Sequence, residues 1–163
     1  YYLTWKSNKL GYNARVINSG RHVNDAMGAH VGKQVVQKML EQDKNPLESR
    51  ILVMGLTFKE DVADIRNTKV VDVIRELQSY SIAVDVIDPF ANPSEVGHEY
   101  GFDLTEKPAE GAYDAVILAV SHEPYRGMTE TDFEALMKDD KGILADLKGL
   151  LRGQIKRLNY WSL

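Results

Sequence analysis

The stretch that decides the fold of this chain is Val53-Met54-Gly55-Leu56-Thr57-Phe58-Lys59-Glu60-Asp61-Val62-Ala63-Asp64-Ile65-Arg66-Asn67-Thr68. An apolar run from Ile51 leads into Gly55, a polar loop with a lysine and an arginine follows, and a helical pattern then begins. A strand, a loop and a helix start in this order form an anion-binding pocket in α/β proteins, because free backbone N–H groups and the helix dipole favour negative charge. We therefore expect the rest of the chain to be arranged around an anion pocket here.

Composition excludes several classes of protein. The chain has 163 residues, enough for one or two domains, and no cysteine, so it holds no disulfide, thiolate metal site or cysteine nucleophile of its own. Residues 50–163 carry a formal charge of −7 and residues 1–49 carry +3, and such an acidic main part argues against nucleic-acid binding. The longest apolar run falls far short of the ~18 residues that span a bilayer. We expect a cytoplasmic protein with no membrane segment and, because the chain starts at Tyr1 without methionine, a part of a longer one.

Residues 14–41 form a long predicted helix, in which apolar and small residues recur at three- and four-residue steps from Val16 to Val35. Several glycines lie within it. Since each glycine costs about 1 kcal/mol in a helix interior, they indicate close contact with another helix. Two interpretations are open: a helix that bridges domains or forms the core of a dimer, and an amphipathic helix packed on its own domain.

After this helix the pattern changes to alternating strands and helices. Asp43-Lys44-Asn45-Pro46 ends the helix, because proline disfavours the helical conformation of the residue before it, and we place a domain boundary there, between residues 1–45 and 46–163. Short apolar runs that alternate with helical patterns are typical of an α/β fold with an open parallel sheet flanked by helices. The predicted strands are 50–55, 82–87, 115–120 and 143–145, with an edge strand within 157–161; the predicted helices are 68–79, with Asn67 as N-cap, 93–99 and 129–138.

Polar side chains follow each of the four main strands. They are Lys59 after the first strand, Asp88 after the second, His122 after the third, and Asp146 with Lys148 after the fourth. Parallel strands end at the same edge of a sheet, and ligands of open α/β sheets bind beyond that edge. The sequence thus predicts a composite pocket, and its cations make a nucleotide diphosphate the expected ligand.

The cations of the first loop have two interpretations each. No G-x-G-x-x-G fingerprint follows the first strand, so a glycine loop alone does not bind a pyrophosphate here. Phe58 and Lys59 offer an aromatic face beside a point charge, or are a buried ring and a solvated amine. Arg66 could form a bidentate fork on a phosphate, or a surface ion pair with Asp61 or Asp64, which sequence alone favours.

Asp88 and His122 also have plainer interpretations. Asp88 stands where a ribose-binding carboxylate would stand, yet Asp88-Pro89 is also a turn, which we favour. His122 could act as an acid, a base or a donor to a ligand, but a lone histidine is more often structural. No nucleophile–base pair and no metal-ligand spacing can be assembled, so we assign no catalytic residue and no metal.

Residues 55–68 carry a resemblance that continues through 86–89, 115–122 and 143–149. Together these segments resemble the C-terminal domain of the UDP-glucose/GDP-mannose dehydrogenase family, and residues 1–4 and 21–27 look like the end of its central helical region. The resemblance covers nearly the whole chain, and its Phe-Lys segment is quite specific. The tyrosine pair, the Arg-x-x-Asn-Asp helix and the Ala-Val-x-His strand end look most like the branch that acts on UDP-N-acetylhexosamines.

The resemblance implies a part of an NAD-dependent nucleotide-sugar 6-dehydrogenase. Full-length members oxidise the C6 alcohol of a nucleotide sugar to a carboxylate with two NAD+, by way of a cysteine thiohemiacetal. An N-terminal Rossmann domain holds the NAD, and the Rossmann-like C-terminal domain binds the UDP moiety. Because the cysteine motif and the NAD domain lie outside this chain, we expect the fragment to be inactive alone.

Four residues match the family's binding positions. Phe58 and Lys59 match its substrate-contacting pair, and Arg66 matches an arginine that reaches the NAD phosphates. Lys148 stands where other members carry a substrate-contacting arginine, and it keeps the charge but loses the bidentate fork. The resemblance also implies a homodimer through the 14–41 helix.

A second class of function stays open beside the enzyme fragment. In it, the chain is a noncatalytic α/β oligomerisation module with a vestigial nucleotide pocket. The retained cations at the strand ends, Lys59 and Lys148, argue against this interpretation.

Overall fold

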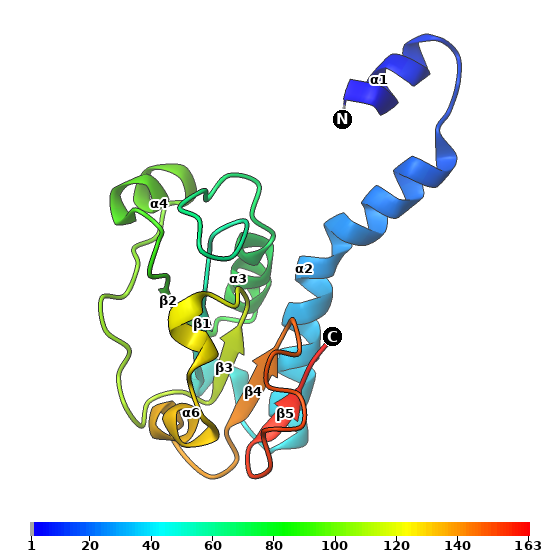
Figure 1. Cartoon of the computed structure of the whole chain (residues 1–163). Coiled ribbons are helices and arrows are strands. Elements are labelled where there is room, and N and C mark those ends of the chain that lie inside the picture. The colour runs from blue at the N-terminus through cyan, green and yellow to red at the C-terminus, as the bar shows by residue number, and fades with distance from the viewer. Residues whose placement is uncertain (1) are drawn as a thin grey trace.

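Five strands form the centre of the structure, a computed structural model that describes residues 2–163 (Figure 1). They are β1 (Arg50–Met54), β2 (Ala83–Ile87), β3 (Ala115–Leu118), β4 (Ile143–Asp146) and β5 (Asn159–Trp161). Their order is β2-β1-β3-β4-β5, and every neighbouring pair is parallel. The predicted parallel sheet is therefore confirmed, and the tail supplies its edge strand.

Helices cover the sheet and extend beyond it. Among the described residues they are α1 (Tyr2–Lys9), α2 (Arg15–Glu41), α3 (Val70–Ser79), α4 (Pro93–Tyr100), α5 (Glu123–Arg126) and α6 (Glu130–Leu136), with a 3-10 turn at Pro46–Glu48. The predicted helices correspond to α2, α3, α4 and α6. The sequence pattern does not predict α5, because one helical turn is too short to show a period.

The core lies on both faces of the sheet. In β1, Ile51 and Val53 belong to a cluster that includes α2 and α3, whereas Leu52 and Met54 belong to a second cluster that includes α6. All four side chains are almost completely buried. A strand that is buried on both faces needs apolar residues at successive positions, which explains the unbroken apolar runs in the sequence.

The start of α3 differs from the prediction. Asn67 is not the N-cap: it has a φ of 60°, and Lys69 occupies the cap position without a side-chain cap. The hydroxyl of Thr68 accepts the N–H of Val70 at 3.3 Å instead. Asn67 tolerates this left-handed conformation and so serves the turn before the helix.

The two halves of α2 have different surroundings. Residues from Gly28 to Met39 supply its buried positions, and Val16 and Val23 in the first half are 86% and 60% exposed. Figure 1 shows the first half extending away from the sheet, with α1 at its far end. The second half thus packs on its own domain, and the first half leaves the bridging or dimer interpretation open.

Glycines permit the close contact between α2 and α3. A Cβ atom at Gly28 would lie 2.5 Å from the Cβ of Asp72, and one at Gly32 would lie 2.6 Å from the Cγ of Glu76. At Gly20, in the projecting half, a Cβ would meet nothing within 4 Å. The expectation of a close helix–helix contact is confirmed for the glycines of the second half.

Lys44 attaches the end of α2 to the sheet. Its side chain is buried, and its ammonium pairs with Asp114 at 3.1 Å and with Asp139 at 2.8 Å. Asp114 also accepts the backbone N–H of Arg50 at the start of β1. This buried pair crosses the position where the sequence places a domain boundary, and that boundary stays a prediction.

Substitution of Gly28 by alanine should weaken the α2–α3 contact. Because the new methyl group meets the Asp72 Cβ rather than a flexible chain end, we expect Gly28→Ala to lower the free energy of unfolding by about 1–3 kcal/mol. Urea denaturation followed by circular dichroism measures it. The matched control is Gly97→Ala in α4, where a Cβ atom would meet only Asp103 at 3.8 Å; it should cause no loss, since alanine favours the helix. Equal stabilities of the two variants would contradict the close packing.

Candidate functional site

The strand order creates a switch point between β1 and β3. The chain leaves β1 for β2 on one side and leaves β3 for β4 on the other, and ligands of open α/β sheets bind at such a point. The loops after β1 and β3 touch here. Gly55 has a φ of 90°, and a Cβ on it would lie 2.6 Å from the Cβ of Val120. Only glycine allows these two loops to approach so closely.

Asp88 ties the end of β2 to the loop after β1. One carboxylate oxygen accepts the N–H groups of Leu56 and Thr57 at 2.6 and 3.0 Å, and the other accepts those of Phe90 and Ala91 at 2.8 and 2.9 Å. Burial raises the pKa of this carboxyl, but the four N–H donors outweigh it and hold the pKa below its ordinary value. The turn interpretation is correct, and the fully buried side chain has no surface for a ribose.

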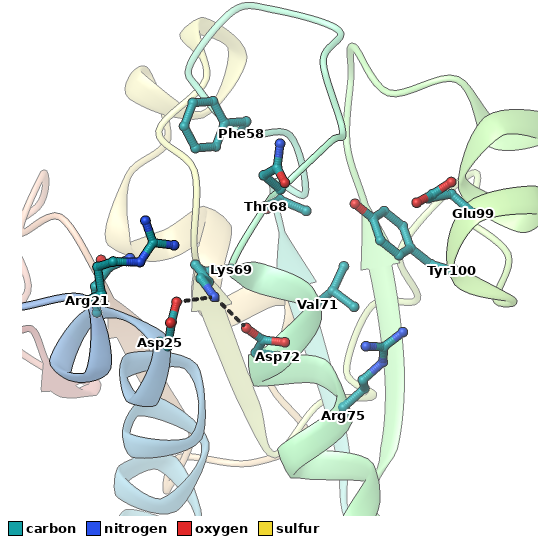
Figure 2. Close-up of a pocket in the computed structure, with 12 residues that line it drawn as sticks. Arg21, Asp25, Phe58, Thr68, Lys69, Val71, Asp72, Arg75, Glu99 and Tyr100 are labelled. Carbon is teal, nitrogen blue, oxygen red and sulfur yellow. Dashed lines mark ion pairs between the residues drawn. The ribbon is translucent and has the colours of Figure 1, made fainter. Parts of the chain in front are cut away.

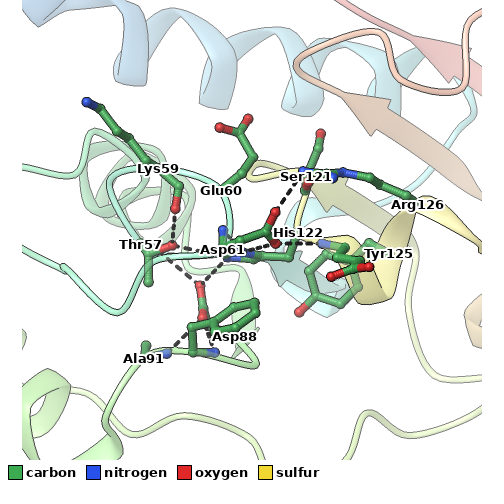
Figure 3. A network of polar contacts seen from close by, with 12 residues as sticks. Thr57, Lys59, Glu60, Asp61, Asp88, Ala91, Ser121, His122, Tyr125 and Arg126 are labelled. Atoms are coloured by element: carbon green, nitrogen blue, oxygen red, sulfur yellow. Dashed lines mark hydrogen bonds and ion pairs between the residues drawn. The ribbon is translucent and has the colours of Figure 1, made fainter.

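His122 connects three strand ends in one network (Figure 3). Its side chain is completely buried, and its Nδ1 accepts the backbone N–H of Asp61 at 2.9 Å. Its Nε2 lies 3.0 Å from Asp88 Oδ2 and 3.1 Å from Thr57 Oγ1. Both nitrogens are engaged inside the protein, so His122 is structural here and is not a donor to a ligand.

Asp61 and Asp64 bind the charged side chains around the loop. Asp61 accepts the N–H of Glu123 at 2.7 Å and pairs with Arg126 at 2.8 Å. Arg66 pairs with Asp64 through two nitrogens, at 2.9 and 3.0 Å, and this pair lowers the pKa of Asp64 to about 2. The sequence-favoured surface pair of Arg66 is therefore present, with Asp64 and not Asp61. Arg66 stays 79% exposed.

Phe58 and Lys59 project from the loop into solvent. Phe58 is 51% exposed, so the interpretation as a buried ring is wrong, and the Lys59 ammonium lies 5.4 Å from the centre of its ring. Lys148, from the loop after β4, forms an ion pair with Glu60. That pair brings the fourth strand end to the first loop, as the composite pocket requires.

Asp146 does not take part in a solvent-facing site. Its Oδ2 accepts the N–H of Leu151 at 2.7 Å and the hydroxyl of Tyr160 at 2.8 Å. The other oxygen is buried and has no partner within residues 2–163. Of the predicted strand-end residues, only Lys59 and Lys148 thus face a ligand's approach, while the three others hold the loops.

A cleft lies beside this edge, between α2, α3 and α4 (Figure 2). It measures about 570 Å³, and Phe58 forms part of its wall, but Lys59, Lys148 and Arg66 do not line it. Asp25 of α2 pairs across it with Lys69 at 2.9 Å, so this charged residue in the middle of the helix has a specific contact.

Sequence reasoning missed most of the cleft's polar lining. Arg21, Lys69, Arg75 and Tyr100 come from three separate segments. The charged Asp25 in mid-helix is the single signal that points to them. Charges of both signs mix in this lining, where Asp25 and Asp72 both pair with Lys69. At the strand ends, Lys59 is exposed and has no carboxylate partner within residues 2–163. We therefore take the strand ends as the candidate anion site.

Two kinds of site are not found in the described part of the chain. Within residues 2–163, no group of three or more His, Asp and Glu side chains is arranged to hold a metal ion. No helix in that range combines the length and apolar character needed to cross a membrane.

Curated relatives match nearly the whole chain. A UDP-N-acetyl-D-glucosamine 6-dehydrogenase of Pseudomonas aeruginosa is 46% identical over 151 residues, which cover 93% of this chain and 36% of that protein. A UDP-N-acetyl-D-glucosamine 6-dehydrogenase of Salmonella typhi is 42% identical over 151 residues and is covered to 35%. The chain thus spans about a third of the length of these relatives.

Solved structures share the fold. A UDP-N-acetyl-mannosamine dehydrogenase from S. aureus superposes with a TM-score of 0.74 at 22% identity, covering 99% of this chain and 35% of that one. Identity this low supports the fold alone. Residues 52–153, which run from within β1 through the switch point into the loop after β4, match the family described as the UDP-glucose/GDP-mannose dehydrogenase family, UDP binding domain. The chain belongs to the UDP-glucose/GDP-mannose dehydrogenase family and contains its C-terminal UDP-binding domain.

Proposed function

We propose that the chain binds the UDP moiety of a UDP-sugar at the strand ends, as part of an NAD-dependent UDP-sugar 6-dehydrogenase. One observation carries the proposal: the buried network holds the loop after β1 so that Phe58 and Lys59 point outward, with Lys148 within reach of the same loop. The nearby carboxylates of Asp61 and Asp88 are bound to backbone N–H groups. They leave the cation of Lys59 available for a diphosphate.

The two lysines differ in their ion pairing in the absence of ligand. Lys59 forms no ion pair within residues 2–163, and its charge is available at once. Lys148 pairs with Glu60, so a phosphate has to displace that carboxylate. Both side chains of the Glu60–Lys148 pair are partly exposed, and an exposed pair of this kind contributes little. We assign Lys59 the larger share of the affinity and Lys148 the smaller.

Phe58 adds an apolar surface to the site. Its ring is half exposed beside Lys59 and also borders the cleft between α2 and α3. An exposed ring that is held by its backbone loses little freedom when a ligand packs on it. We assign Phe58 the contact with an apolar face of the substrate.

The nicotinamide cofactor fits this chain only in part. Arg66 is exposed and is oriented by Asp64, as a contact to a phosphate of NAD requires. No G-x-G-x-x-G loop follows β1. The residues present therefore suit a single contact to the dinucleotide and do not form its main binding site. The chain also has no cysteine. We propose that it supplies substrate binding, and that the NAD cradle and the oxidation chemistry belong to other parts of a longer protein.

The relatives indicate the class of substrate. The two relatives reported above act, by their names, on UDP-N-acetyl-D-glucosamine, and a third, at 27% identity, on UDP-N-acetyl-D-mannosamine. We propose a UDP-N-acetylhexosamine for this chain, in a cytoplasmic protein. We assign the strand-end cations to the diphosphate, and the choice among these sugars to contacts with the sugar ring.

The loss of either lysine should weaken the binding of UDP to this chain. We expect Lys59→Ala to raise the Kd about tenfold and Lys148→Ala about threefold, because Lys148 gives up Glu60 to bind. Isothermal titration calorimetry with UDP measures both. Lys156→Ala is the matched control, since this exposed lysine precedes β5 and so lies at the opposite edge of the sheet. No heat from the unaltered chain at millimolar UDP, or equal Kd values for all variants, would overturn the assignment.

We also propose that the chain forms a homodimer through α2. Leu10, Tyr12, Val16 and Val23 are 60–86% exposed on the projecting segment, and a group of exposed apolar side chains of this kind is typical of a protein–protein contact. The noncatalytic alternative shares this dimer and differs only in its lack of nucleotide binding.

Sedimentation velocity separates these two functions when it is combined with the UDP titration. We expect a dimer that binds UDP, and a monomer after Val16→Glu, because a buried charge opposes association. Leu47→Glu, at a 70% exposed apolar residue outside α2, is the control and should stay dimeric. A dimer without UDP affinity would favour the oligomerisation module, and a wild-type monomer would remove the role of α2.

A further inference from the structure

We propose that His122 is a positioning residue whose neutral ring sets the conformation of the segment that carries Phe58 and Lys59. The inference rests on the proposed function, because it concerns the affinity of the same UDP site. His122 itself has no exposed surface, so it acts through the loop and not by touching the nucleotide.

The hydrogen bonds fix the tautomer of the ring. The backbone N–H of Asp61 points at Nδ1 at 2.9 Å, and an N–H can only donate, so Nδ1 carries a lone pair. The ring hydrogen therefore sits on Nε2, where it is shared between Asp88 Oδ2 at 3.0 Å and Thr57 Oγ1 at 3.1 Å. A hydrogen on Nδ1 would face the Asp61 N–H and break this contact.

One ring thereby holds both ends of the binding segment. Thr57 and Asp61 bracket the three residues that carry the aromatic face, the free cation and the partner of Lys148. Thr57 continues the network by donating its hydroxyl to the carbonyl of Lys59 at 2.9 Å. Asp61 has a φ of 59°, a left-handed conformation that aspartate adopts more readily than most residues. The bond from its N–H to Nδ1 helps to hold the backbone there.

The ring is itself fixed from the other strands. Asp88 receives its Nε2–H, the Phe90 ring lies 5.0 Å away and the Tyr125 ring 5.8 Å away, centre to centre. Figure 3 shows the carboxylate of Asp88 reaching the imidazole of His122 from the turn after β2. The two bonds of the ring differ in importance. Asp88 Oδ2 keeps two other donors if Nε2 is lost, whereas the Asp61 N–H has Nδ1 as its acceptor.

Three substitutions separate these contributions. His122→Asn places an amide oxygen near the position of Nδ1 and keeps an acceptor for Asp61, His122→Gln keeps only a donor near the position of Nε2, and His122→Leu keeps neither. For binding of UDP to the full chain by calorimetry, we expect Kd to rise about twofold for asparagine, about fivefold for glutamine and about tenfold or more for leucine. The asparagine variant thus rescues the affinity that leucine loses.

A matched variant excludes a general loss of stability as the cause. Phe133→Leu removes volume from the cluster on the α6 face of the sheet and should lower the thermal midpoint without changing the Kd for UDP. Nitrogen-15 NMR of the unaltered chain supplies a second readout, which should report a hydrogen on Nε2 of His122 and none on Nδ1.

The outcomes distinguish this inference from the proposed function. If the unaltered chain binds no UDP, the proposed function fails and the inference fails with it. If it binds UDP but glutamine or leucine at position 122 leaves the Kd unchanged, or glutamine restores more affinity than asparagine, His122 does not position the loop and the UDP site stands. A hydrogen on Nδ1 would overturn the inference directly.

Discussion

The arrangement of the strand ends depends on the buried carboxylate of Asp88. It accepts four backbone N–H groups, two from the loop after β1 and two from the turn after β2, and it also faces the imidazole of His122. A buried charge is stable only when its hydrogen-bonding capacity is filled, and here the backbone fills it. The same bonds close the turn after β2 and fix the loop after β1. One side chain thus fixes the backbone at the ends of both strands. The exposed residues of the site are positioned by this unexposed one.

Much of the fold could be predicted because its signals are local. Continuous apolar runs such as Ile51–Met54 predict strands buried on both faces, and glycines at 28 and 32 predict a close helix pair. The failures have a common cause. Asn67 is a residue type that often caps helices, but here it lies in the left-handed turn before α3. The hydroxyl of Thr68 accepts the N–H of Val70 in its place. Tertiary geometry decides which of several suitable residues is used.

The sequence predicts which residues lie at the site, but not which of them can contact a ligand and which of them hold the loops. The sequence predicts that Lys59, Asp88, His122 and Asp146 lie at one edge of the sheet, because parallel strands end at the same edge. It cannot separate exposed groups from structural ones, since that depends on which side chains the neighbouring loops cover. In the structure, His122 and Asp146 are completely buried, and Lys59 is exposed. The cleft between α2 and α3 escaped sequence reasoning because its lining comes from segments with no shared pattern.

The location of bound nucleotide tests the central claim most directly. Backbone amide shifts of the isotope-labelled chain, recorded by NMR during a titration with UDP, would map that location. The account predicts that the largest changes fall in residues 56–61, 120–123 and 147–149, around the network of Asp88 and His122. Changes concentrated in residues 21–25 and 68–75 instead would place the nucleotide in the cleft between α2 and α3 and contradict the account.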